Sequence, residues 1–104
     1  MKPIVLSRLA ETDIDGIWDY IASDNPQAAD RVLDAIEDAL VRLSRNPGVG
    51  HFREDLADRR HRFFAVFSYL IIFRIEAEAL NVVRVLHGSR DVHALLGADL
   101  GNSS

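Results

Sequence analysis

Four histidines and a series of arginines supply most of the side chains in this sequence that could do chemistry. The histidines, His51, His61, His87 and His93, do not have the spacing of metal ligands on one helix. The chain also has no cysteine, so we expect neither a disulfide nor a metal site, and we expect no cofactor. An imidazole titrates near neutral pH, so His87 could serve as a general acid, and the alternative is a structural histidine.

Arginine accounts for all the basic residues except Lys2. Arg84 has apolar neighbours on both sides in a predicted strand, so its side chain either reaches an open sheet face or is buried in an ion pair. Glu76 and Asp91 are conceivable partners. The run from Arg59 to Arg62 either guides a partner or forms a solvated edge facing nearby acids, which are Glu54, Asp55 and Asp58.

The charge distribution bears on the class of partner. The net charge is −4, and up to Asn46 there are five basic residues against nine acidic ones. After Asn46, seven arginines balance seven acids. A protein that binds RNA or DNA mainly through phosphate contacts carries a positive field, because that field supplies most of the non-specific affinity. The sequence therefore argues against such a protein.

The arginines from Arg62 onwards lie in a region that predicts β-strands. Five of the eight aromatic residues and many β-branched residues fall between Arg59 and Asp91. Short connections then predict an antiparallel meander of three consecutive strands, at Phe63 to Phe67, Tyr69 to Ile75 and Leu80 to His87.

The first half of the chain predicts a short strand and two helices. Pro3 to Leu6 is apolar and ends at Ser7, a good N-cap for a helix whose apolar residues recur at three and four positions up to Ala22. The acids of this helix, Asp13 among them, fall mostly off its apolar face. Asn25 and Pro26 predict the N-cap and first position of a second helix, which runs to Asn46 and packs antiparallel to the first.

The remaining segments complete a single domain. Pro47 to Arg60 has no sustained periodicity and is predicted to be a connecting loop. Ser89 could cap a short helix carrying Val92, Leu95 and Leu96. We expect one domain over residues 1–96 and a polar tail over 97–104, folded as an α+β sandwich of order β-αα-βββ with a mainly antiparallel sheet. No signal peptide or membrane span is apparent, which favours a cytoplasmic location.

Distributed motifs from about Ile4 to about Leu96 resemble the ParE branch of the RelE/ParE superfamily of bacterial toxins. The most specific are Ile17-Trp18-Asp19-Tyr20-Ile21, Asp24-Asn25-Pro26, and Val83 to His87 followed by Gly88, Arg90 and Asp91. The resemblance implies a toxin of a type II toxin–antitoxin pair that forms a hetero-oligomer with its antitoxin. That antitoxin is expected to be ParD-like, with an amino-terminal part, ribbon-helix-helix or similar, that binds the operon DNA, so the toxin meets DNA only indirectly.

Two activities occur in this superfamily. RelE-like members resemble ribosome-dependent mRNA endonucleases, which supply several lysines and arginines, whereas ParE-like members are associated with inhibition of DNA gyrase. The loop and sheet here contain no lysine. A nuclease site with fewer catalytic side chains would use Arg62, Arg84 and His87. The acidic charge favours gyrase inhibition without enzymatic activity, and the alternatives are the endonuclease and a non-toxic degenerate member.

Candidate contact residues follow from the same resemblance. Those that could face the target are Arg62, Arg74, Arg84, His87 and Arg90. Those that could bind the antitoxin are Trp18, Tyr69 and Phe73, although Trp18 lies on a periodic helical face, where a tryptophan more often belongs to the core. Apolar side chains on the sheet face away from the helices predict an exposed patch that a disordered antitoxin segment covers.

Overall fold

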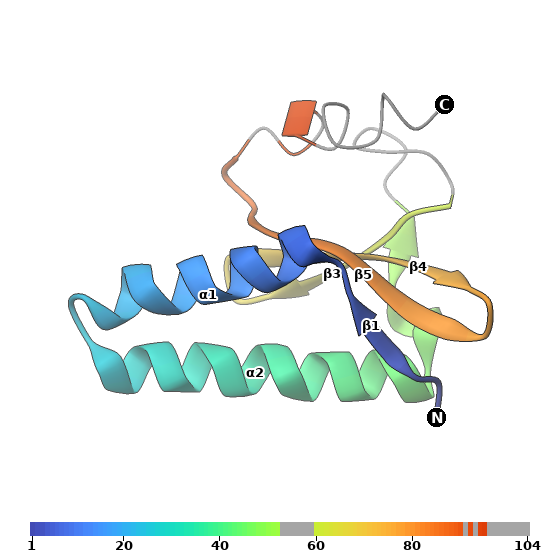
Figure 1. Cartoon of the computed structure of the whole chain (residues 1–104), viewed down its shortest axis with the longest axis horizontal. Helices are drawn as coiled ribbons and strands as arrows, with labels where there is room; N and C mark the ends of the chain where they lie inside the picture. Colours follow the sequence, from blue (N-terminus) through green and yellow to red (C-terminus); the bar gives the residue numbers. More distant parts are fainter. Residues whose placement is uncertain (53–59, 91, 93, 96–104) are drawn as a thin grey trace.

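The computed structural model of the chain describes residues 1–52, 60–90, 92, 94 and 95. Two helices pack on one face of a five-stranded sheet, which confirms the predicted α+β architecture (Figure 1). In chain order the elements are β1 (Ile4–Leu6), α1 (Arg8–Ala22), α2 (Pro26–Arg45), the 3-10 helix η1 (Pro47–Val49), β2 (His51–Phe52), β3 (Arg62–Val66), β4 (Tyr69–Glu76) and β5 (Ala79–His87).

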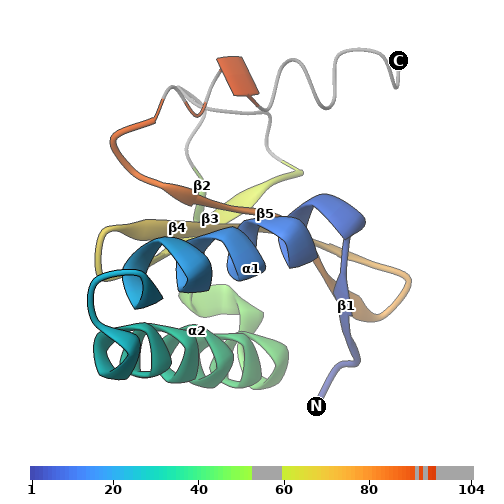
Figure 2. The ribbon, with the colours of Figure 1, turned by 60° about the vertical axis from the view of Figure 1, so that its left-hand side comes forward.

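Both helices begin at the capping residues that the sequence identifies. Ser7 Oγ accepts a hydrogen bond from the Ala10 backbone N–H at 2.9 Å, and Asn25 Oδ1 accepts one from the Ala28 N–H at 3.1 Å. Pro26 occupies the start of α2, where a missing N–H removes no intrahelical bond. The short connection returns the chain so that α1 and α2 lie side by side (Figures 1 and 2).

The sheet has the order β1-β5-β4-β3-β2, and only the β1–β5 pair is parallel. The first strand of the chain therefore joins the sheet beside the last. Between β4 and β5 the register shifts by one residue, because Ile72 pairs with Arg84 but Phe73 pairs with Val82. Val83 is the extra residue of a β-bulge, a device that re-aims the side chains next to it.

The main core lies between the helices and the sheet. Its largest fully buried side chains come from α2 and the two central strands, and they are Ile36, Leu43, Ile71, Phe73 and Leu80. Burying such side chains stabilises the fold by about 1.5–3 kcal/mol each relative to leaving them exposed. This core fixes α1 over β5, which is the arrangement that positions the candidate site.

The opposite sheet face is not a bare apolar patch, which corrects the sequence-based expectation. Phe63, Ile72 and Leu86 form a second buried cluster on this face together with Val92 from the segment after β5, and Leu95 packs against it. Val92, Ala94 and Leu95 have helical backbone, and they lie on the side of the sheet away from α1 and α2 (Figure 2). The chain therefore covers part of this face itself.

The segment predicted as a loop from Pro47 contains two elements, η1 and β2, and β2 pairs with β3 through His51 and Phe63. A two-residue strand is too short to show periodicity in the sequence. Gly50 joins these elements, and a Cβ there would lie 2.4 Å from Phe73 Cζ. Glycine is therefore required for this close approach to the core.

The hairpin turns also differ from the sequence-based prediction. Phe67 was expected to end a strand, but β3 ends at Val66 and Phe67 has a φ of 53°. Ala77 and Glu78 form the next turn with φ values of 53° and 57°. Residues 97–104, predicted as a tail, lie outside the described residues. Neither helix in the described part of the chain has the length and hydropathy needed to cross a membrane.

Candidate functional site

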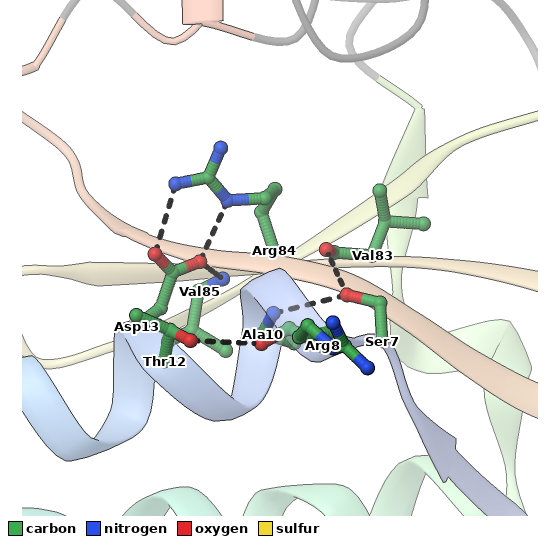
Figure 3. A network of polar contacts seen from close by, with 8 residues as sticks. All are labelled: Ser7, Arg8, Ala10, Thr12, Asp13, Val83, Arg84 and Val85. Carbon is green, nitrogen blue, oxygen red and sulfur yellow. Dashed lines mark hydrogen bonds and ion pairs between the residues drawn. The ribbon is translucent and has the colours of Figure 1, made fainter. Parts of the chain in front are cut away.

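The side chains of α1 and β5 meet in a buried ion pair. Arg84 Nε lies 2.8 Å from Asp13 Oδ2, and Arg84 Nη2 lies 2.9 Å from Asp13 Oδ1, so the guanidinium binds both carboxylate oxygens (Figure 3). The Val85 backbone N–H also donates to Asp13 Oδ2 at 3.0 Å. Each of the two side chains is only about a tenth exposed. Its place off the apolar face of the helix suggested that Asp13 points into solvent. The structure shows instead that Asp13 is a buried structural residue.

This contact replaces a missing strand. β1 pairs with β5 only as far as Leu6 and Val82, so beyond that point no strand among the described residues pairs with this edge of β5. Ser7 Oγ donates to the Val83 carbonyl at 2.7 Å, and Asp13 accepts from the Val85 N–H. Polar side chains at the start of α1 thus satisfy backbone groups that a longer β1 would have satisfied.

An open groove of about 650 Å³ begins where this side-chain pairing ends. On the helix side it is lined by residues at four-residue spacing, Thr12, Gly16 and Tyr20, and on the sheet side by Tyr69, His87 and Arg90. A Cβ at Gly16 would meet nothing within 4 Å, so bare helix backbone forms part of the groove wall. We call this cavity the end groove.

His87 is held in one orientation within the end groove. The Ser89 backbone N–H donates to His87 Nδ1 at 3.0 Å, the Ser89 hydroxyl lies 2.6 Å from the same atom, and the Tyr69 ring packs edge-on at 5.3 Å between centroids. Because a backbone N–H can only donate, Nδ1 is an acceptor and a neutral ring carries its proton on Nε2. The imidazole therefore presents one N–H donor.

The three residues considered for RNA cleavage do not converge. Arg62 pairs in register with Phe73 of the main core, and its Nη1 donates to the Pro47 carbonyl at 3.3 Å. Its guanidinium also lies 5.0 Å from the centre of the Phe52 ring. Arg84, in contrast, pairs in register with Ile72 of the second cluster, so Arg62 and Arg84 leave the sheet on opposite faces.

The five target-facing candidates therefore separate into different environments. His87 and Arg90 line the end groove, whereas Arg84 is 8% exposed and bound to Asp13. The ion pair considered for Arg84 from the sequence is present, with a partner, Asp13, that the sequence analysis did not name. Arg74 lies 3.6 Å from Glu76 on the face opposite the helices.

The three antitoxin-binding candidates also lie in different environments. Tyr69 lines the end groove. Trp18 is half-buried, and its indole N–H donates to Asp30 Oδ1 of α2 at 3.0 Å. Phe73 has no exposed surface and packs in the main core, so in this conformation it offers a partner nothing to contact. Its alternation in β4 directs it toward the helices.

Sequence reasoning missed the helical wall of the groove. Thr12, Gly16 and Tyr20 share one face of α1. A glycine in the middle of a helix is a signal because it destabilises the helix relative to alanine, so its presence points to a packing or functional reason. Tyr20, 80% exposed, is a second signal. Within the described residues, no cluster of three or more His, Cys, Asp or Glu side chains is suited to hold a metal ion.

Comparison with known proteins agrees with this architecture. Residues 4–92 match the family described as the ParE toxin of the type II toxin–antitoxin system parDE. Toxin ParE1 of Caulobacter vibrioides is 33% identical over 99 residues, which cover 93% of this chain and all of that protein. Toxin ParE3 of the same organism is 29% identical, covering 93% of this chain and 97% of that protein.

A solved structure has the same fold. A chain of the chromosomal ParDE toxin–antitoxin system from P. aeruginosa superposes with a TM-score of 0.70 at 20% identity, covering 84% of this chain and 96% of that one. At this identity the likeness concerns the fold alone. The family match over most of the chain carries the assignment, and the chain belongs to the ParE toxin family of type II toxin–antitoxin systems.

Proposed function

We propose that this chain inhibits DNA gyrase through direct protein contact and is neutralised in a hetero-complex by a ParD-like antitoxin. The support for the antitoxin is the family, which is described as the ParE toxin of a type II toxin–antitoxin system. On this proposal the chain acts in the cytoplasm and meets DNA only through its target or through the DNA-binding part of the antitoxin.

One geometric observation favours contact over RNA cleavage. Cleavage through the 2′-hydroxyl needs a base, an acid and cations converging on one phosphate. Arg62 and Arg84 leave opposite faces of the sheet, and each is bound within the fold, Arg62 to the Pro47 carbonyl and Arg84 to Asp13. The net charge of −4 adds to this argument, since it opposes binding to an RNA backbone.

The proposal is tested by expressing the chain from a tight promoter, with and without the neighbouring small gene, and following DNA and protein synthesis by pulse labelling. We expect DNA synthesis to fall first, with an SOS response, and co-expression of the neighbouring gene to restore growth. Purified chain should then inhibit supercoiling by gyrase.

Two other outcomes would replace the proposal. Early arrest of translation with cut mRNA would support the endonuclease, and the single variants Arg84→Ala and His87→Ala would then be compared for cleavage and for antitoxin binding. Normal growth with a folded, expressed chain would identify a non-toxic member. Failure of the toxin and the neighbouring gene product to co-elute would remove the antitoxin part.

A further inference from the structure

The end groove differs in charge from the rest of this acidic protein. Among the described residues that line it, Asp13 is the one carboxylate, and it is bound to Arg84 and to the Val85 N–H. Arg90 is exposed, and no acidic side chain in the described part of the chain pairs with it. Among its described residues the groove therefore carries a cation and no available anion, on a chain of net charge −4.

The same groove contains neutral hydrogen-bond donors. His87 presents one ring N–H, since its Nδ1 accepts from Ser89, and the hydroxyls of Tyr20 and Tyr69 belong to the same groove. A groove that holds a guanidinium together with N–H and O–H donors suits a carboxylate, because charge-assisted hydrogen bonds to planar oxyanions are stronger than neutral ones.

Two exposed aromatic side chains in and beside the end groove are typical of protein–protein interfaces. Tyr20 is 80% exposed, and Phe67, at the tip of the β3–β4 turn, is 71% exposed. Phe67 lines a smaller hollow that shares Tyr69, His87 and Ser89 with the end groove, so the two hollows adjoin at these residues. Phe67 also has a φ of 53°, an unusual conformation for a bulky residue. Exposed aromatics beside an arginine are typical of the residues that dominate binding energy between proteins.

We propose that the end groove binds a segment of the target protein that carries a carboxylate beside an apolar side chain, the carboxylate on Arg90 and the apolar group among Tyr20, Tyr69 and Phe67. The identity of the partner as the target rests on the proposed function. Nucleic acid fits less well, because one arginine on an acidic protein does not supply the positive field that phosphate binding requires.

The chemistry of the groove can be tested without gyrase. Labelled full-length chain is titrated, with NMR detection, with acetylated peptides of alternating leucine and glutamate, or of alternating leucine and glutamine. We expect the glutamate peptide to shift the amide signals of Gly16, Tyr20 and Ser89 selectively, and the glutamine peptide to shift them far less. Equal shifts with both peptides, no selective shifts at millimolar peptide, or stronger shifts with a single-stranded oligonucleotide would overturn the proposal.

Matched variants distinguish a loss of peptide binding in the groove from a loss of folding. Gly16→Trp fills the groove, whereas Gly16→Ala adds a methyl group where nothing lies within 4 Å. Arg90→Glu reverses the charge and Arg90→Lys retains it. We expect Gly16→Trp and Arg90→Glu to weaken binding of the glutamate peptide by about tenfold or more, while the two conservative variants stay within a few-fold of wild type. Melting temperatures at or above that of wild type show that the variants fold, and Gly16→Ala should raise the value slightly because alanine favours a helix over glycine.

The gyrase experiment distinguishes failure of the groove from failure of the proposed function. If wild-type chain binds purified gyrase, Gly16→Trp and Arg90→Glu should lose that binding and the growth arrest, and unaltered gyrase binding by both variants would refute the role of the groove. If wild-type chain does not bind gyrase, the proposed function fails, and the peptide titration alone decides whether the groove recognises carboxylates.

Discussion

The two halves of strand β5 have different neighbours on the same edge. From Leu80 to Val82 that edge pairs with the backbone of β1, as in an ordinary sheet. From Val83 to Val85 it is bound instead by two side chains of the α1 region, Ser7 and Asp13. Beyond Val85 the end groove opens.

The difference shows how a helix can substitute for a strand. A strand neighbour satisfies an edge with backbone groups that any residue provides, so single side chains there matter little. A helix can satisfy the same edge only through side chains of the right type and length. We therefore expect substitutions of the α1 side chains that bind β5 to lower the free energy of unfolding. The loss should be much larger than for substitutions near the half of β5 that pairs with β1 or in its adjoining turn.

The largest effect is expected for Asp13→Ala. It leaves Arg84 buried without its carboxylate and the Val85 N–H without its acceptor. Breaking one side of a buried pair costs about 3–5 kcal/mol in the free energy of unfolding. Urea denaturation of the purified chain measures this value.

A double variant sharpens the same test. Asp13→Leu combined with Arg84→Met removes both charges and should recover a large part of the lost stability, because two apolar side chains leave no buried charge. If Asp13→Ala alone costs under about 1 kcal/mol, the pair behaves as a surface contact and the comparison between the two halves fails.

Ser7→Ala should have the next largest effect. The Ser7 hydroxyl caps α1 by accepting from the Ala10 N–H and also donates to the Val83 carbonyl. Loss of the cap and of this hydrogen bond should together cost about 1–2 kcal/mol. Ser7→Thr, which keeps a hydroxyl, is the control, and thermal unfolding followed by circular dichroism compares the two variants. Equal losses in both would mean that the hydroxyl is not responsible.

At the other end of β5, replacement of Ala77 and Glu78 by Asn and Gly should stabilise the chain. Both residues have positive φ values, which an L-residue with a Cβ adopts at a cost and the Asn-Gly sequence favours in two-residue hairpins. The expected gain is about 1 kcal/mol in the free energy of unfolding. Denaturation of the two single variants would show whether the glycine supplies most of the gain, and a loss of stability would indicate that the turn has another conformation.

The smallest effect is expected for Lys2→Met. Lys2 Nζ lies 3.1 Å from Glu78 Oε2, but the Glu78 side chain is 94% exposed, so water and salt screen the pair. The midpoint of unfolding should stay within experimental error of wild type at low and at high salt. A clear salt-dependent loss would show that this surface pair contributes to the β1 end of the sheet.

Much of the fold could be predicted from local sequence patterns. Ser7, Asn25 and Pro26 mark the helix starts, and the aromatic and β-branched runs mark β3, β4 and β5 within one or two residues at each end. Those signals act over a few residues, so they survive without knowledge of the tertiary structure. β2 was missed because a two-residue strand depends on its partner, β3, more than on its own composition.

The candidate site depended on contacts between distant parts of the chain. Asp13 and Arg84 are 71 positions apart, and the β-bulge at Val83 determines the face from which Arg84 leaves the sheet. The sequence by itself determined the residue types of the groove, its arginine, histidine and tyrosines, and the helical spacing of Thr12, Gly16 and Tyr20. Only the tertiary structure decided that Arg84 is bound internally and Arg90 is exposed, because burial and pairing depend on which elements pack together, and local patterns do not encode that packing.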